Sequence, residues 1–435
     1  MCRAIRRSRS AARPCGLVFL PRSAGYTAMA GALSSLRVLD LTRVLAGPWA
    51  AQVLGDLGAE VVKIERPGSG DETRAWGPPY LRDADGNDTT ESAYYLSANR
   101  NKRSVTVDFT TSKGQEIVRR LAATSDVLLE NFKAGGLAQY GLDYAALRHI
   151  NPRLIYCSIT GFGQTGPYSG RAGYDFLIQA MGGLMSITGR ADGTPGGGPQ
   201  KVGVALTDVL TGLYSVISIL AALNSRHETG TGQHIDMALL DVQITSLANQ
   251  NMNYLTTGRP PARLGNAHPN IVPYQDFPSR DGGIVIAVGN DRQFAALSRE
   301  LGHPRWAADC RFATNAARVA NRDLLIGLMS EVTRTATTRQ WTETLERAGV
   351  PCGPINDLRD VFDDPHVKAR GLAISLPHPL CGLLPLVASP IRLSDTPVEY
   401  TLPPPLLGEH TRALLASRLG MSEAEIDALA AEAVI

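Results

Sequence analysis

The sequence predicts an α/β protein with a Rossmann-like, doubly wound large domain and a smaller α+β domain. Over residues 31–230, short apolar runs alternate with helical segments, an order that produces parallel strands with helices on both faces of the sheet. The pattern changes near Gly258–Pro261, and a length of 435 residues exceeds that of one ordinary domain. We therefore expect a large domain at 31–230, a linker at 231–259, a small domain at 260–355 and a helical C-terminal segment at 356–435.

The first predicted unit is a strand, a helix and a second strand. Leu36–Leu41 is a short apolar run, and the turn Thr42–Gly47 leads to a helix that Pro48 is well placed to open. Gly58 is suited to close this helix in the left-handed conformation, and Glu60–Glu65 is the next strand. Such a unit implies parallel strands joined by a right-handed crossover.

The alternation continues beyond the first unit. Ser112 and Gln115 form a predicted capping box for a helix that ends at Ala123. The turn after the first strand lacks the GxGxxG spacing of dinucleotide-binding folds, which disfavours NAD or FAD. Further predicted strands are Ser104–Asp108, Val127–Glu130 and Leu154–Ile159, with helical segments near Leu137 and Tyr144.

The small domain and the C-terminal segment have their own local signals. Ser422 and Glu425 form a predicted capping box for the last helix. In the small domain the predicted strands are Ile271–Phe277 and Ile284–Val288, and the predicted helices are Arg292–Leu301, Arg322–Thr333 and Arg339–Ala348.

The composition is that of a globular protein whose ligands are small molecules. Apolar residues make up 44% and charged residues 19%, and the 43 basic and 41 acidic side chains nearly cancel. Nucleic-acid and membrane-surface partners are disfavoured because both call for a basic excess. The apolar stretch Leu213–Leu223 has about 11 residues against the roughly 20 that span a bilayer, so it predicts a buried helix.

Cysteine and histidine spacing predicts neither a metal site nor a disulfide framework. The six cysteines include no CxxC pair, and the eight histidines include no HExxH motif. We expect no metal and a reducing compartment, which makes a cytoplasmic location the default.

Residues 1–30 lie outside the predicted fold. They carry six arginines, and no acidic residue precedes Asp40, a composition that suits an organellar transit peptide. Such a peptide would place the protein in the mitochondrial matrix. The alternative is a start assigned too early, with Met29 as the initiator.

Asp208 is the leading candidate for chemistry. It follows the glycine-rich stretch Gly189–Gly203 and precedes a predicted apolar helix, Val209–Leu223. Aspartate is a preferred N-cap, so a structural role is the ordinary explanation. The same helix terminus would also keep the carboxylate ionised and able to attack a carbonyl, with the glycine-rich loop closing over it. Position alone does not separate these roles.

Other polar positions are less specific. Asp175 opens a second apolar helix and is again a predicted cap. Arg66 follows a parallel strand at the edge where open α/β sheets bind ligands, and an arginine there could contact a phosphate. The polar residues Asn99–Arg103 precede a strand, where a turn is the ordinary explanation.

Taken in order, the motifs resemble those of the family III CoA-transferases, the group that includes formyl-CoA, carnitine and succinyl-CoA:glutarate transferases. The resemblance places the nucleophilic aspartate of that family at Asp208. It implies an interlocked homodimer of two threaded rings, with the C-terminal segment returning to the large domain. The matching motifs are Leu39–Thr42, Ala46–Pro48, Leu57–Glu65, Asn99–Lys102, Glu130–Phe132, Thr207–Asp208, Pro351–Pro354 and Leu406–Thr411.

The resemblance also implies a set of coenzyme A contacts. Gln139 stands where some relatives carry a CoA-contacting arginine, and the chain lacks the tetraglycine loop of the formyl-CoA enzymes, which disfavours oxalate and formate. The implied contacts are Leu45, Ala46, Arg66, Val107, Asp108, Thr110, Asn131, Phe132, Lys133, Arg171 and Tyr174.

Within the family, the segments Asn266–His268 and Ile271–Gln275 are most similar to the succinyl-CoA:glutarate transferases. The implied activity moves CoA from an acyl-CoA to a small carboxylate through an aspartyl anhydride and an aspartyl-CoA thioester, with no metal or redox cofactor. A dicarboxylate acceptor calls for a cation, and the candidates are Arg100, Arg171, Arg263 and His268. The expected substrate contacts are Asp175, Arg263 and His268.

Two other functions remain open. α-Methylacyl-CoA racemases share this fold but need a second base, and they place a histidine where this chain has Tyr174. A tyrosine, with an ordinary pKa of about 10, is a poor base near neutral pH. A non-catalytic acyl-CoA-binding protein would need no ionised carboxylate at Asp208.

Overall fold

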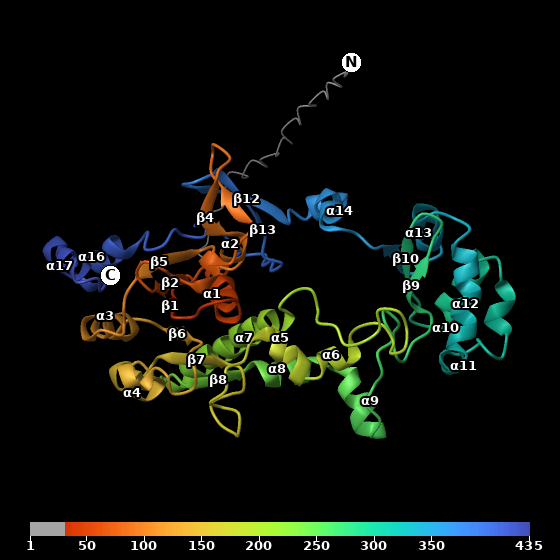
Figure 1. Cartoon of the computed structure of the whole chain (residues 1–435), viewed down its shortest axis with the longest axis horizontal. Helices are drawn as coiled ribbons and strands as arrows, with labels where there is room; N and C mark the ends of the chain where they lie inside the picture. The colour runs from red at the N-terminus through yellow and green to blue at the C-terminus, as the bar shows by residue number, and fades with distance from the viewer. Residues whose placement is uncertain (1–30) are drawn as a thin grey trace, which may run out of the picture.

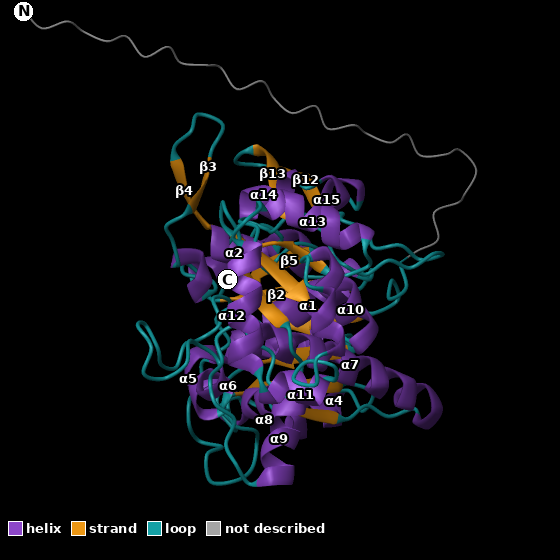
Figure 2. Ribbon diagram, turned by 90° about the vertical axis from the view of Figure 1, so that its right-hand side faces the viewer, coloured by secondary structure: helices purple, strands orange, loops and turns teal. Residues whose placement is uncertain are grey.

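The computed structural model describes residues 31–435, which form two bodies joined by two separate chain segments (Figure 1). The larger body holds the parallel sheet and both ends of the described chain. The smaller body lies beyond the two connecting segments, and Figure 2 views the molecule from that side. The expectations for residues 1–30 lie outside the described residues.

The sheet of the larger body has six parallel strands in the order β5-β2-β1-β6-β7-β8. Counted along the chain, this is the 3-2-1-4-5-6 order of a doubly wound fold, with its switch point between β1 and β6. The predicted fold class is confirmed. The strands are β1 (Arg37–Asp40), β2 (Glu60–Glu65), β5 (Lys102–Thr106), β6 (Val127–Glu130), β7 (Ile155–Thr160) and β8 (His234–Ala238).

The last strand of this sheet lies inside the segment 231–259 that was expected to be a linker. β8 pairs with β7 along its whole length, and α8 (Leu239–Ser246) and α9 (Asn249–Thr257) follow it. As an edge strand, β8 exposes His234 and Asp236, packs Ile235 and Met237 only partly against the core, and buries Ala238. Five residues of which only two alternate as apolar and partly buried give too weak a signal to predict the strand.

Helices cover both faces of the sheet. On one face, α1 (Ala46–Asp56) and α7 (Leu206–Thr229) pack against each other and against the sheet. The other face is covered by α3 (Ser112–Ala123), α4 (Tyr144–Ile150), α16 (Thr411–Leu419) and α17 (Glu423–Ala431). The C-terminal helices therefore complete a core that the first strands begin.

The remaining elements form the smaller body and the connections. The smaller body has an antiparallel sheet in the order β11-β10-β9, covered by helices. Its elements are β9 (Tyr274–Pro278), β10 (Gly283–Ala287), α10 (Asp291–Glu300), η3 (Pro304–Ala308), α11 (Asn315–Ala320), α12 (Arg322–Thr333), α13 (Thr338–Arg347) and β11 (Cys352–Pro354). The others are η1 (Glu72–Ala75), β3 (Tyr80–Arg82), β4 (Asp88–Ser92), α2 (Ala93–Ser97), η2 (Ala138–Tyr140), α5 (Asp175–Met181), α6 (Leu184–Ile187), α14 (Leu358–Asp363), α15 (Pro365–Ala369), β12 (Ala373–His378) and β13 (Gly382–Val387).

Several helix starts differ from the predictions by one to three residues, whereas α12 begins at the predicted Arg322. The capping box of Ser422 and Glu425 is confirmed at the start of α17. The predicted capping box at Ser112 is wrong, because Thr111 stays extended and its side chain accepts the hydrogen bond from the Gly114 N–H. Ser112 is already the first helical residue.

α7 is longer and less buried than predicted. Among the described helices it alone is long and apolar enough to cross a membrane by length and composition, and 44% of its most apolar window is buried. One side packs against α1, while Leu213, Tyr214, Ile217 and Leu220 are exposed. The expectation of a buried helix therefore holds for one face only.

Candidate active site

A cavity of about 200 Å³ opens at the carboxyl ends of β1, β6 and β7, at the switch point of the sheet. Open α/β sheets bind their ligands at this place. The structure brings Asp208 together there with many of the predicted CoA contacts. The predicted residues that line it are Leu45, Ala46, Asn131, Phe132, Lys133, Arg171, Tyr174 and Asp208.

The other predicted CoA contacts line a second cavity, of about 560 Å³, that adjoins the first. The two cavities share Arg43, Glu72 and Phe132. Arg43 Nη1 lies 2.7 Å from Glu72 Oε1, and its guanidinium lies 4.6 Å from the centre of the Phe132 ring. The predicted contacts in the second cavity are Arg66, Val107, Asp108 and Thr110.

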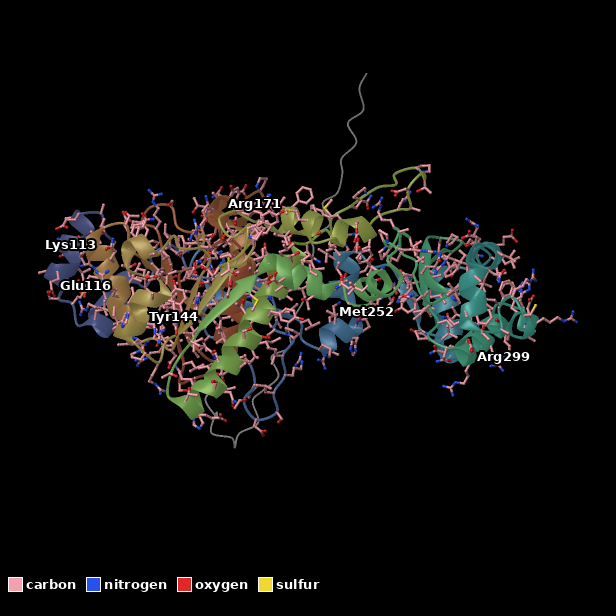
Figure 3. The ribbon with its side chains drawn as sticks, turned by 90° about the horizontal axis from the view of Figure 1, so that it is seen from below. Lys113, Glu116, Tyr144, Arg171, Met252 and Arg299 are labelled. Carbon is pink, nitrogen blue, oxygen red and sulfur yellow. The ribbon has the colours of Figure 1, made fainter. Side chains whose placement is uncertain are left out.

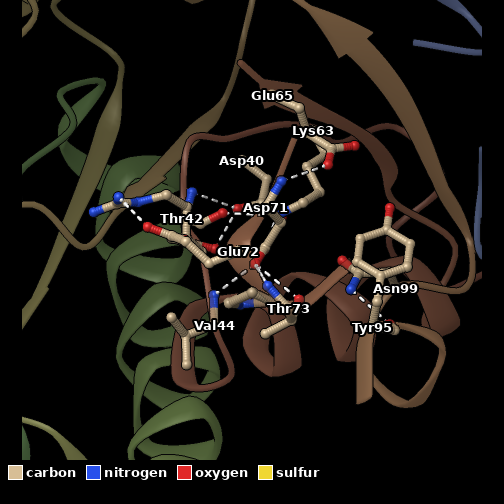
Figure 4. A network of polar contacts seen from close by, with 12 residues as sticks. Asp40, Thr42, Val44, Lys63, Glu65, Asp71, Glu72, Thr73, Tyr95 and Asn99 are labelled. Atoms are coloured by element: carbon tan, nitrogen blue, oxygen red, sulfur yellow. Dashed lines mark hydrogen bonds and ion pairs between the residues drawn. The ribbon is translucent and has the colours of Figure 1, made fainter. Parts of the chain in front are cut away.

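Buried charged side chains hold the loop between β1 and α1 in place (Figure 4). Lys63 Nζ donates to the Thr42 carbonyl at 2.7 Å and pairs with Asp71 at 2.9 Å. Asp71 Oδ1 in turn accepts from the Val44 N–H at 3.2 Å. Burial opposes ionisation of Asp71, but the Lys63 charge and the hydrogen bonds from Thr73 and Lys63 together outweigh it and lower the pKa of Asp71 to about 2. The loop thus rests on a permanently ionised pair.

Two more polar side chains that the sequence singled out also hold this loop. Asn131 accepts from the Arg43 N–H at 3.0 Å and donates to the Arg43 carbonyl at 2.7 Å, so β6 and the β1 loop are tied together. Lys102 Nζ contacts Asp40 at 3.1 Å and donates to the Pro48 carbonyl at 2.9 Å. The ordinary explanation of Asn99–Arg103 as a turn holds at Arg100 and Asn101, whereas Lys102 begins β5 and is fully buried.

Asp208 is not the N-cap of its helix. α7 begins at Leu206, the capping position falls on Ala205, and Asp208 is the third helical residue. The Asp208 side chain is nearly buried, borders the cavity, and accepts no hydrogen bond from any residue within 31–435.

Asp175 takes the capping role for α7. Its Oδ1 accepts from the N–H of Thr207 at 2.8 Å and from that of Asp208 at 3.3 Å. At the start of its own helix, Tyr174 rather than Asp175 occupies the N-cap position, so the predicted cap of α5 is wrong. Asp175 does not line the cavity, and its predicted substrate contact is not seen there.

The expectation that the helix terminus keeps Asp208 ionised is also wrong. Burial, and then the charge of Asp175, raise the pKa of Asp208 to about 7. The main physical reason is burial that no hydrogen bond to the carboxylate offsets, since the N–H groups of Thr207 and Asp208 donate to Asp175.

Tyr94 is a neighbour of Asp208 that the sequence did not single out. Burial, and then the charges of Asp208 and Asp175, raise the pKa of Tyr94 to about 12, so its phenol stays protonated. Its ring packs edge-on against Trp76 at 5.1 Å. No local pattern could have predicted it, because Tyr94 and Asp208 are far apart in the sequence and come near each other only through the fold.

Three of the four candidate cations for a substrate carboxylate lie outside the cavity of Asp208. Arg100 is buried in an ion pair with Asp56. Arg263 pairs with Asp192 and donates to the Ser186 carbonyl at 2.9 Å. The His268 ring packs against Tyr274 at 5.2 Å, away from both cavities.

Arg171 is the candidate that does line the cavity. It lies on the larger body, whereas Arg299 marks the smaller one (Figure 3). Its guanidinium lies 4.6 Å from the centre of the Tyr168 ring, and no carboxylate in the described chain lies within ion-pair distance of it. The glycine-rich stretch Gly189–Gly203, expected to close over the site, contributes none of the described lining residues.

Comparisons with known proteins agree with this geometry. The model of CoA-transferase family III matches residues 33–411. A succinate–glutarate CoA-transferase of Agrobacterium fabrum is 54% identical over 88% of this chain and 95% of its own. The mouse succinyl-CoA:glutarate CoA-transferase is 46% identical over 93% of this chain and 90% of its own.

Solved structures show the same fold. The crystal structure of a CaiB/BaiF family protein from Brucella suis superposes with a TM-score of 0.79 at 52% identity, covering 90% of this chain and 100% of that one. The resemblance drawn from the motifs is thereby confirmed. The chain belongs to CoA-transferase family III and is a CoA-transferase.

Proposed function

We propose that this enzyme moves coenzyme A from succinyl-CoA to glutarate through covalent intermediates on Asp208. The observation that carries the proposal is the Asp208 carboxylate at the edge of a cavity lined by the predicted CoA contacts. The names of the Agrobacterium and mouse relatives support the choice of both substrates.

The chemistry follows from a carboxylate nucleophile. An Asp208 oxygen attacks the acyl carbon of the donor thioester, the carbon–sulfur bond breaks, and CoA leaves as the thiolate. The product is a mixed anhydride. The thiolate then attacks the Asp208 carbonyl carbon, which releases succinate and leaves an aspartyl-CoA thioester.

The second half of the reaction reverses these steps with the acceptor. A glutarate carboxylate attacks the aspartyl thioester and expels the CoA thiolate, which forms a new anhydride. The thiolate attacks the glutaryl carbon of that anhydride, so glutaryl-CoA forms and the Asp208 carboxylate is regenerated. Every bond is exchanged between acyl groups, and no step involves oxidation or reduction.

Arg171 is the residue that we assign to the distal carboxylate of the dicarboxylates. It shares the cavity with Asp208, and the ion pairs of Arg100 and Arg263 already use the charges of those side chains. A guanidinium binds a carboxylate through parallel N–H donors, which favours a dicarboxylate over a monocarboxylate of similar size.

The working unit in this proposal is a homodimer. Exposed apolar side chains lie on α5 and α7 of the larger body and on α9, whose Met252 lies between the two bodies in Figure 3. Apolar surface of this extent is typical of protein–protein contacts. The exposed residues are Phe176, Leu177, Met181, Leu213, Tyr214, Ile217, Leu220, Met252, Tyr254 and Leu255.

Exchange of labelled CoA into succinyl-CoA, without an acceptor, tests the nucleophile. Asp208→Ala is expected to abolish the exchange, by on the order of 1000-fold or more, while the affinity for CoA stays within a few-fold. With succinyl-CoA alone, hydroxylamine should convert Asp208 of the native enzyme to a hydroxamate, seen as a mass shift on its peptide.

Several outcomes would contradict parts of this proposal. Exchange by the Asp208→Ala enzyme would remove Asp208 from the mechanism. Equal rates with glutarate and with monocarboxylates would exclude a dicarboxylate preference. Deuterium exchange at the α-carbon of a 2-methylacyl-CoA without CoA transfer would establish a racemase instead.

A further inference from the structure

We propose that Asp175 positions the nucleophile: it caps the first turn of α7 from a neighbouring helix, so that Asp208 is left uncapped and facing the cavity. This inference rests on the proposed role of Asp208. It assigns to Asp175 a function in the reaction without contact to the substrate, since Asp175 does not line the cavity.

The first step is to identify the hydrogen-bond partner of each backbone N–H group at the start of α7. The first N–H groups of a helix have no partner within the helix. Val209 makes the first helical bond, to the Ala205 carbonyl, and Leu206 donates to the Val204 carbonyl. The N–H groups of Thr207 and Asp208, which lie between them, donate to Asp175 Oδ1. Asp175 stands 32 residues before Thr207, so the cap comes from a different helix.

The second step is that Asp175 is itself held in place. Its Oδ2 accepts from Gln179 Nε2 at 2.7 Å, one turn further along α5. Gln179 Oε1 accepts from the Val202 N–H at 2.9 Å, which ties the segment before α7 to the same pair. Asp175 is 8% exposed and Gln179 is fully buried, so both side chains belong to the protein interior rather than to the cavity wall.

The third step is the effect on Asp208. A carboxylate in the first turn of a helix is stabilised by free N–H groups and would turn toward them. With these groups donating to Asp175, the Asp208 carboxylate keeps its unshared oxygens for the substrate. A less stabilised carboxylate is also the stronger nucleophile once it is ionised.

The charge of Asp175 acts in the same direction. It opposes the ionised form of Asp208, consistent with the raised pKa of that side chain, and it does not oppose the neutral anhydride and thioester. Acylation of Asp208 therefore relieves a repulsion between two neighbouring carboxylates. The other ionisable groups that surround Asp208 are Tyr94 on α2 and Arg43, Glu72, Lys133 and Arg171 around the cavity.

The test is the pH dependence of labelled-CoA exchange in an Asp175→Asn variant. The amide removes the charge, and it cannot serve both the α7 N–H groups and the Gln179 donor. We expect kcat to fall roughly tenfold while KM for succinyl-CoA changes less than about threefold. The midpoint of the pH profile should move down by about one unit.

Two further variants separate positioning from simple loss of structure. Asp175→Asn/Gln179→Glu supplies an acceptor opposite the new amide and should recover most of the lost kcat. Asp143→Ala removes an aspartate cap of α4, which accepts from the Ala146 N–H at 3.3 Å. This control should lower the melting temperature without moving the pH midpoint.

The outcomes distinguish this inference from the proposed function. If the Asp208→Ala enzyme exchanges CoA, the nucleophile is wrong and the role of Asp175 falls with it. If that enzyme is inactive and a folded Asp175→Asn enzyme keeps the native pH midpoint and kcat, only the positioning role is overturned. An effect of Asp175→Asn confined to KM would overturn it as well.

Discussion

Glu130 is a second buried carboxylic acid beside the cavity, at the end of β6. It is 6% exposed, and its Oε2 accepts from the Phe132 N–H at 2.7 Å. Burial outweighs this bond and the one from Ser158, and it raises the pKa of Glu130 to about 7. Ionisation of Glu130 therefore changes the charge at the end of β6, directly before Asn131 and Lys133.

The raised pKa has a direct consequence for stability. A carboxyl whose pKa is raised on folding adds stability below its ordinary pKa, and that stability is lost as the pH rises through the folded value. Glu130 shifts from an ordinary 4.5 to about 7, which corresponds to at most about 3 kcal/mol between pH 5 and pH 8.5.

We therefore predict that Glu130→Gln removes part of the pH dependence of unfolding. Urea denaturation at pH 5 and pH 8.5 should show the native protein losing more stability than the variant as the pH rises. The raised pKa of Asp208 is common to both proteins and cancels in the comparison. The same pH dependence in both would show that Glu130 is not the group responsible.

At the scale of elements, the start of α1 stores backbone strain. Val44 has φ of +72°, a left-handed conformation that a β-branched residue rarely adopts. Such a residue persists only where its surroundings hold it, and here Asp71 and Asn131 fix the loop on either side. The strain lies directly before Leu45 and Ala46, which line the cavity.

We predict that Val44→Gly raises the free energy of unfolding by about 1 kcal/mol, because glycine takes this conformation without strain. Val53→Gly is the matched control, since Val53 is a partly buried valine within α1. It should instead lose about 1 kcal/mol or more. A similar loss of stability in both variants would show that Val44 is unstrained.

The sequence predicted most elements but few of the contacts between them. Glu60–Glu65, Val127–Glu130 and Arg322–Thr333 have the predicted bounds because each carries its own periodic signal. The cap that Asp175 supplies to α7 has no local signal, since the partners come together only through the fold. The same holds for the candidate site. The motifs predicted Asp208 and the residues around it, whereas the pKa of Asp208 depends on burial and on Asp175.

At the scale of the whole molecule, the exposed apolar face of α7 predicts that two copies of the chain form a dimer. Ile217 is 59% exposed on that face, on the helix that carries Asp208. We expect light scattering to give twice the chain mass of 46.5 kDa at micromolar concentration, without dissociation on dilution.

A matched pair of substitutions tests where the contact lies. Ile217→Glu places a charge on the exposed apolar face and should prevent assembly. Ile150→Glu changes an isoleucine of similar exposure, 44%, at the end of α4 and should leave the dimer intact. A native mass of a single chain, or a dimer in the Ile217→Glu protein, would contradict the assignment.

Because α16 and α17 pack on the sheet, the core of the larger body is completed only after the C-terminal helices have been synthesised. Leu415 and Ile426 are fully buried against the same sheet face as Leu39 and Val105, and the Asp108 N–H donates to the Val434 carbonyl at 2.7 Å. While the ribosome is still making the smaller body, this face of the emerging sheet is covered by α3 and α4 but lacks the two C-terminal helices. Part of this apolar face therefore stays exposed, and prone to aggregation, until α16 and α17 have left the ribosome. A premature stop codon near residue 410 would leave the core that begins at residue 39 incomplete.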